Sequence, residues 1–228
     1  MKNALIESLI LLCFVGLLGG CSDPKAANDK NFSVAISDYL KTVPACTALD
    51  FGGLPDDAQV YPVSSGGSLS STRAPTLEDF FGKNPKARAF VDSGLIVIAM
   101  TQRDGKDFLG KPETQYFAHA SLTATGRAVY RVIPSTFLGD RAGFCYAQKH
   151  LVSIDNFTEP ADAFGQMASD VHYTWKLGEV ADWAKNPKLQ QVDPEIARNV
   201  DEVAKPVTDS MGMVLTNKGW MAIALLRK

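Results

Sequence analysis

The chain has no large excess of charge of either sign, and it has only three histidines, a common type of metal ligand. Its 228 residues include 23 Lys and Arg against 25 Asp and Glu, which gives a formal net charge of −2. A nucleic-acid-binding protein would show a strong basic excess or stripe, so we expect no nucleic-acid partner. The three histidines, His119, His150 and His172, lack the close spacing of a metal-binding motif. We therefore expect no metal and no cofactor.

Motifs that identify an enzyme are also missing. The sequence contains no G-x-S-x-G nucleophile elbow, no phosphate-binding loop of the Walker type and no dinucleotide fingerprint. The stretch Ser65-Gly66-Gly67-Ser68 has the composition of a linker. We expect a non-enzymatic protein. The alternative is a cell-wall or lipid hydrolase that brings two carboxylates together in space, or places His150 beside a nucleophile. The candidate carboxylates are Asp56, Asp57, Glu159, Asp162 and Asp170.

Long hydrophobic runs are absent except near the N-terminus. Leu9 to Leu18 is an apolar stretch of ten residues, preceded by the positive charge of Lys2. A membrane-spanning helix needs roughly 20 such residues, so this run is too short to cross a bilayer. Its length and flanks are typical of the apolar region of a signal peptide.

The apolar run ends in Leu18-Gly19-Gly20-Cys21, an aliphatic residue, two small residues and a cysteine. This sequence resembles the lipobox of bacterial prolipoproteins. The resemblance implies cleavage before Cys21, a diacylglycerol on its thiol, and an acyl chain such as palmitate on its amine. Several acyl chains give stable anchoring that one chain does not. The alternative is an ordinary secretory signal with a fortuitous cysteine.

The lipobox divides the chain into a signal peptide (1–20), a lipidated flexible tether (21–31) and a periplasm-type domain (32–228). Ser22 after the lipidated cysteine favours the outer membrane by the enterobacterial sorting pattern, whereas Asp23 weakens that preference for the outer over the inner membrane. Cleavage removes Lys2 and Glu7, so the remaining 208 residues keep the net charge of −2. That length is sufficient for one domain, or for two small ones with a sub-boundary near 135–143.

Two cysteines remain once Cys13 is removed and Cys21 is lipidated. Cys46 and Cys145 would lie in an oxidising compartment, and we expect a disulfide between them. Two buried thiols are the alternative, because the sequence does not show how close their Cα atoms come.

Hydrophobic spacing predicts short helices mixed with strands. Expected helices cover 32–43, 76–81, 85–93, 180–184 and 194–204, with Thr76 as an N-cap and Pro85 in a first turn. Strands are expected at 95–100, 116–123, 144–154, 167–177, 213–216 and 220–225, with a flexible loop at 63–75. In 167–177, apolar and polar residues alternate, which is typical of an antiparallel sheet with one buried face. These patterns predict an α+β fold with antiparallel sheets and short packed helices.

Part of the first half resembles a winged-helix domain. The similarity rests on Gly94-Leu95-Ile96 after a helix, a charged segment from Gln102 to Glu113 in the place of a wing, and Leu122-Thr123-Ala124-Thr125-Gly126. It implies a helix followed by a β-hairpin. The charged segment has no net charge, so we expect no DNA-binding role.

The tryptophans Trp175, Trp183 and Trp220 lie in apolar stripes, and we expect them in the core rather than on a binding surface. The sequence thus favours a membrane-anchored envelope lipoprotein that binds a protein or supports an assembly. A narrower alternative is an immunity or inhibitor lipoprotein against a toxin that reaches the periplasm.

Overall fold

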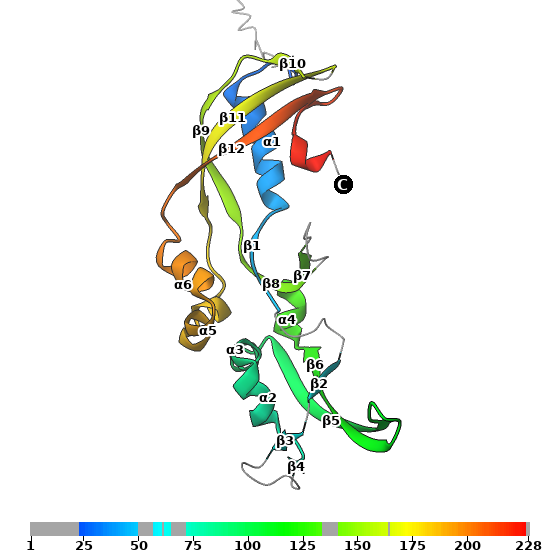
Figure 1. The fold of residues 1–228 in the computed structure, drawn as a ribbon. Helices are drawn as coiled ribbons and strands as arrows, with labels where there is room; N and C mark the ends of the chain where they lie inside the picture. Colours follow the sequence, from blue (N-terminus) through cyan, green and yellow to red (C-terminus); the bar gives the residue numbers. More distant parts are fainter. Residues whose placement is uncertain are drawn as a thin grey trace, which may run out of the picture.

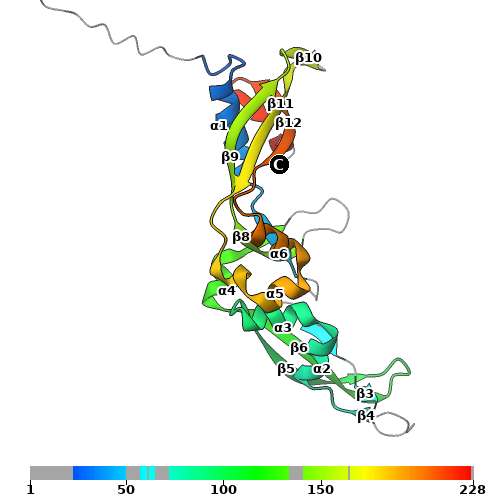
Figure 2. The same ribbon diagram turned by 90° about the vertical axis from the view of Figure 1, so that its left-hand side faces the viewer.

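The computed structural model describes residues 23–49, 57–60, 62–64, 72–133, 141–163 and 165–226. They form an elongated molecule in which three tiers of sheet and helix are stacked end to end (Figures 1 and 2). We name these the upper, middle and lower tiers after their places in Figure 1. Every strand pairing is antiparallel and helices are interspersed, which confirms the α+β class. The expected signal peptide and Cys21 lie outside the described residues.

The upper tier packs helix α1 (Asp29–Lys41) on a five-stranded sheet. Phe32 and Ile36 of α1 are fully buried against Val171 and Tyr173 of the sheet. The expected alternation in 167–177 is confirmed, because Tyr173 is buried where Lys176 is exposed. The strands of this sheet are β9 (Lys149–Phe157), β10 (Ala161–Ala163), β11 (Gln166–Leu177), β12 (Val207–Thr216) and β13 (Gly219–Ala222), and the short helix η2 (Ile223–Leu225) follows β13.

The middle tier is a three-stranded sheet flanked by short helices. Its strand order is β1-β8-β7, with β1 (Ala45–Ala48), β7 (Tyr130–Ile133) and β8 (Arg141–Ala147). Phe144 and Tyr146 of β8 pack with Leu189 and Ile196 of the helices. The helices are α4 (Ala124–Val129), η1 (Asp182–Lys185), α5 (Pro187–Val192) and α6 (Pro194–Asp201). Helix α5 begins at Pro187, since Pro is favoured at the first helical position.

The lower tier has strand order β2-β6-β5, with β2 (Asp57–Val60), β5 (Ile96–Lys106) and β6 (Pro112–Leu122). Helices α2 (Leu77–Lys83) and α3 (Pro85–Asp92) bury Phe80, Phe81 and Ala87 against it. The capping role of Thr76 is confirmed, and so is the position of Pro85. The expected loop 63–75 begins and ends in a short pairing of β3 (Val63–Ser64) with β4 (Thr72–Arg73), and the residues between them lie outside the described ranges.

Two expectations about strands are wrong. The segment 144–154 is not one strand, because Gln148 separates β8 from β9, which belong to different tiers. The strands expected at 95–100 and 116–123 are too short, because β5 and β6 remain paired as far as Lys106 and Pro112. A hairpin exposed to water on both faces accommodates charged side chains, so charge alone does not mark a loop here. Helix α3 does precede this hairpin, but the winged-helix resemblance itself is not confirmed.

The structure describes residues 23–31 of the segment expected to be a lipidated tether. Helix α1 begins at Asp29, and residues 23–28 form a turn held against β13. The Trp220 indole N–H donates to the carbonyl oxygens of Lys25 and Ala26, at 3.1 and 3.2 Å. In the described part of the chain, no helix combines the length and apolar character needed to span a bilayer.

Candidate functional site

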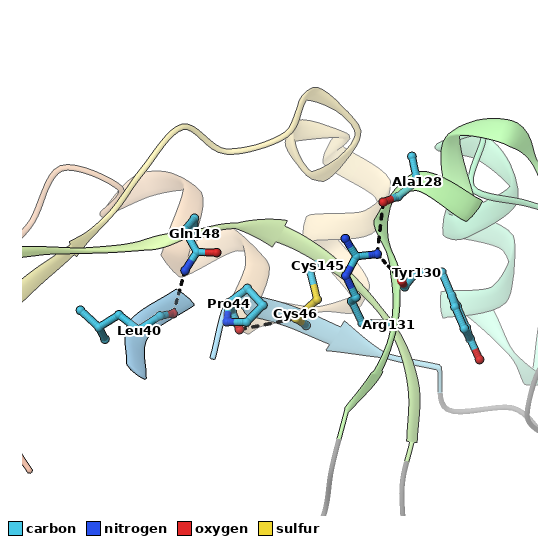
Figure 3. The surroundings of a disulfide bond; sticks show 8 residues. All are labelled: Leu40, Pro44, Cys46, Ala128, Tyr130, Arg131, Cys145 and Gln148. Carbon is cyan, nitrogen blue, oxygen red and sulfur yellow. Dashed lines mark hydrogen bonds between the residues drawn. A yellow bond between two sulfur atoms is a disulfide. The ribbon is translucent and has the colours of Figure 1, made fainter. Parts of the chain in front are cut away.

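Cys46 and Cys145 form a disulfide, as the sequence predicted. The two residues lie opposite each other in the pairing of β1 with β8, although they are 99 residues apart in the chain (Figure 3). Both are only half-buried. The bond joins the strand that leaves α1 to the centre of the middle sheet, and its exposed side opens into a groove.

This groove, which we call the disulfide groove, has a volume of about 640 Å³ and lies where the upper and middle tiers meet. The end of α1, the strands β1, β7 and β8, and helix η2 all contribute to its walls. The lining residues are Tyr39, Lys41, Thr42, Val43, Pro44, Cys46, Arg131, Val132, Ile133, Cys145, Ala224 and Leu225. Most of this surface is apolar, and Val132 remains 56% exposed. Its size and lining are typical of small-molecule sites.

Lys41 and Arg131 line the groove, and the described lining residues include no carboxylate. Lys41 pairs with exposed Asp38 at 2.8 Å. Arg131 donates to the backbone carbonyls of Ala128 and Tyr130 at 3.3 and 2.6 Å (Figure 3). Among the described residues Arg131 has no acidic partner, so its charge is available to an anion. Burial, with a smaller effect of Asp209, raises the pKa of Tyr39, which therefore stays neutral at physiological pH.

A second hollow of about 380 Å³ adjoins the first and shares Lys41, Pro44, Arg131 and Cys145 with it. It extends along β8 to Gln148 and Glu179. The Gln148 side chain donates to the Leu40 carbonyl oxygen at 2.7 Å, and thereby fixes the end of α1 to the joint between β8 and β9 (Figure 3).

The tip of the β5–β6 hairpin is a second candidate site. Phe108 is 95% exposed and Leu109 is 64% exposed, and these two residues are adjacent. The hairpin belongs to the lower tier, at the end of the molecule away from the start of α1 (Figures 1 and 2). Exposed Lys106 and Lys111 flank the apolar pair.

The turn that carries Phe108 and Leu109 is closed by several hydrogen bonds. The Asp107 carboxylate accepts from the backbone N–H groups of Leu109 and Lys111, at 2.9 and 2.8 Å. The Asp107 N–H donates to the Lys111 carbonyl oxygen at 2.8 Å, and Gly110 takes a positive φ of 81°. The apolar pair is therefore held out in water by an ordered turn.

The histidines considered as metal ligands are not brought together. His119 lies on β6 in the lower tier, while His150 and His172 lie on β9 and β11 in the upper tier. His150 is exposed and lies beside Gly178, where β9 begins. Within the described ranges, no three His, Cys, Asp or Glu residues are arranged as a metal site requires.

The carboxylates considered for hydrolysis fall in different tiers. Asp57 belongs to β2 in the lower tier, whereas Glu159, Asp162 and Asp170 belong to the upper tier. Asp56 lies outside the described residues, as does Ser65-Gly66-Gly67-Ser68. The expectation of a core position is confirmed for Trp220, which is 8% exposed, whereas Trp175 and Trp183 are partly buried against a hydrophobic cluster.

Sequence reasoning missed both candidate sites. The hairpin tip carried a detectable signal, since Phe108-Leu109 is an apolar pair within a charged turn that ends in Gly110. No pattern in the sequence indicated the disulfide groove, because its walls come from segments that are far apart in the chain. Comparisons of the chain with protein-family models, with curated proteins and with solved structures found no match.

Proposed function

We propose that this protein is a non-enzymatic envelope lipoprotein, acylated at Cys21, that presents a protein-binding hairpin at the end of an elongated domain. The lipobox residues Leu18 to Cys21 support the anchor. We place the protein on the periplasmic side of a membrane, the outer rather than the inner one. The membrane is one partner through the lipid, and the second is a protein that the hairpin tip recognises.

The position of the first ordered residues supports an upper tier that lies close to the membrane. Asp23 is only two residues beyond Cys21, and its carbonyl oxygen accepts a hydrogen bond from the Asn31 side chain at 2.8 Å. Two extended residues span at most about 7 Å. A lipid on Cys21 would therefore hold the upper tier near the headgroups rather than on a long tether.

The observation that carries the proposal is the exposure of Phe108 and Leu109 on an ordered turn at the opposite end. Burying each of these side chains in a partner would contribute about 2 kcal/mol. Because the turn is closed by the Asp107 hydrogen bonds, little conformational entropy is lost when it binds. Two apolar side chains held in this way form a small anchor for a pocket in another protein.

The test is to crosslink the full-length lipoprotein in its own envelope and to identify what is captured. Three forms are compared: the wild type, the double variant Phe108→Ser/Leu109→Ser, and the control Val34→Ser. Val34 is 60% exposed on α1 in the upper tier, so the control removes an exposed apolar residue from the other end. We expect one specific protein partner with the wild type and the control, reduced at least tenfold in the double variant.

Equal capture by the double variant would contradict the proposal, and so would repeated recovery of no protein. Because the substituted residues are exposed, all three forms should unfold at the same temperature, which separates a lost contact from a lost fold.

The anchor is tested separately with Cys21→Ser. We expect this variant to lose acylation and lipobox cleavage, so that the apolar residues 9–18 stay attached. Incorporation of a labelled fatty acid and the mass of the product measure the two effects. A Cys21→Ser protein that still incorporates the fatty acid, or that is still cleaved before position 21, would contradict the lipobox.

A further inference from the structure

The disulfide groove has the shape of a small-molecule site rather than of a flat protein interface. Its concave volume of about 640 Å³ falls within the range of ligand pockets, about 300 to 1,000 Å³. The walls are fixed by the disulfide and by the Gln148 bond to α1, so the groove is preformed. Exposed Val132 and half-buried Val43 and Leu225 give it an apolar surface that an alkyl chain can contact.

The charges of the groove select an anion. Arg131 and Lys41 are the charged residues of its described lining, and both are cationic. Lys41 forms only an exposed pair with Asp38, an interaction worth little in water. One guanidinium nitrogen of Arg131 donates to two backbone carbonyls, and its other N–H groups can donate to a carboxylate. A guanidinium binds a carboxylate with strong, directional hydrogen bonds.

We propose that the disulfide groove binds a free fatty acid, with its carboxylate at Arg131 and its chain along Val132, Val43 and Leu225. This site is independent of the hairpin tip and does not require the anchor. Each added methylene that becomes buried should raise the affinity about fourfold until the groove is filled. A cationic amphiphile of equal chain length should be excluded by the two positive charges.

The experiment uses the full-length lipoprotein in isolated envelopes and a dodecanoate probe that carries a photoreactive diazirine. After illumination, mass spectrometry locates the labelled peptides. We expect label on 39–46 and 131–133, competed by plain dodecanoate but not by dodecyltrimethylammonium.

Two pairs of variants, each with one residue in the groove and one control outside it, test whether the label depends on the groove. Arg131→Gln should reduce labelling about tenfold, whereas Arg127→Gln, an exposed arginine on α4 outside the groove, should not. Val132→Ser should reduce it severalfold, whereas Val207→Ser, with Val207 42% exposed on β12, should not.

Label spread over the surface, equal competition by the cationic amphiphile, or unchanged labelling of Arg131→Gln would each overturn the proposal. None of these outcomes bears on Phe108, so the fatty-acid proposal and the proposed protein-binding function are tested independently.

Discussion

Asp193 links two elements of the middle tier, β1 and α6, to α3 of the lower tier through one buried carboxylate. Its Oδ2 accepts from the Thr47 hydroxyl on β1 at 2.5 Å and from the Lys86 ammonium on α3 at 2.9 Å. Its Oδ1 accepts from the Ile196 backbone N–H at the start of α6. The residue is 8% exposed, so each of these partners compensates for water that the carboxylate has lost.

Replacing Asp193 should therefore be costly. We expect Asp193→Ala to lower the free energy of unfolding by about 3 to 5 kcal/mol, because it removes the buried acceptor of the Thr47 hydroxyl, the ion pair with Lys86 and the cap of α6. Urea unfolding measures the change. The control is Asp182→Ala, which breaks an exposed pair with Lys185 and should change stability little. Equal effects of the two substitutions would contradict the role assigned to Asp193.

The same carboxylate should make stability depend on pH. Burial raises the pKa of Asp193, but the hydrogen bonds from Thr47 and Lys86 outweigh it, so the pKa is lower in the folded protein. Such a group stabilises the fold above its unfolded pKa of about 3.9, and that contribution is lost as the pH falls through the lowered pKa.

We expect Asp193→Asn to differ most from the wild type near about pH 7, and the gap in unfolding free energy to narrow below about pH 4. Urea unfolding at a series of pH values checks this. A gap that stays constant down to about pH 2 would show that the Asp193 charge does not contribute.

Among the elements, β1 depends most on a covalent bond. It has four residues and pairs only with β8 among the described strands, yet it carries the chain from α1 into the middle tier. The disulfide closes a loop of 99 residues, which restricts the unfolded chain strongly.

We expect Cys46→Ser/Cys145→Ser to lower the free energy of unfolding by about 4 kcal/mol. Reduction of the wild type should have a similar effect, and reduction of the variant should have none. Calorimetry with and without reductant measures both. Unchanged stability of the double variant would mean that β1 and α1 are held by packing alone.

Local signals in the sequence predicted the elements that depend on neighbouring residues. The Thr76 cap, Pro85 in its first turn and the alternation around Tyr173 involve short-range chemistry or a single buried face, and the structure has all three. The break at Gln148 was not predictable, because the strands that place β8 and β9 in different sheets are distant from them in sequence.

The candidate sites, like the strand boundaries, could be predicted from the sequence only in part. Cys46 and Cys145 were identified from their number and compartment, without knowledge of their separation in space. Arg131 carried no signal, because its role depends on the end of α1 and on η2 approaching β7. A site assembled from several elements follows from tertiary packing, which periodicity does not encode.

At the scale of the whole molecule, the three tiers are stacked end to end, and the hydrophobic cluster of the middle tier also contains Phe90 and Ile96 of the lower tier (Figure 1). A compact domain of this length would have a radius of gyration of about 17 Å. We expect small-angle scattering of a soluble form that begins at Ser22 to give a clearly larger value. A value near 17 Å would mean that the tiers fold back on one another in solution.

Because the molecule is elongated, the proposed anchor and the hairpin tip lie at opposite ends, and the tip would be held away from the membrane. The most direct test places a photoreactive amino acid at position 108 or at position 34 of the full-length lipoprotein in living cells. We predict one specific protein adduct from position 108 and no such adduct from position 34. The same adduct from both positions, or none from position 108, would contradict a protein-binding hairpin held away from the membrane.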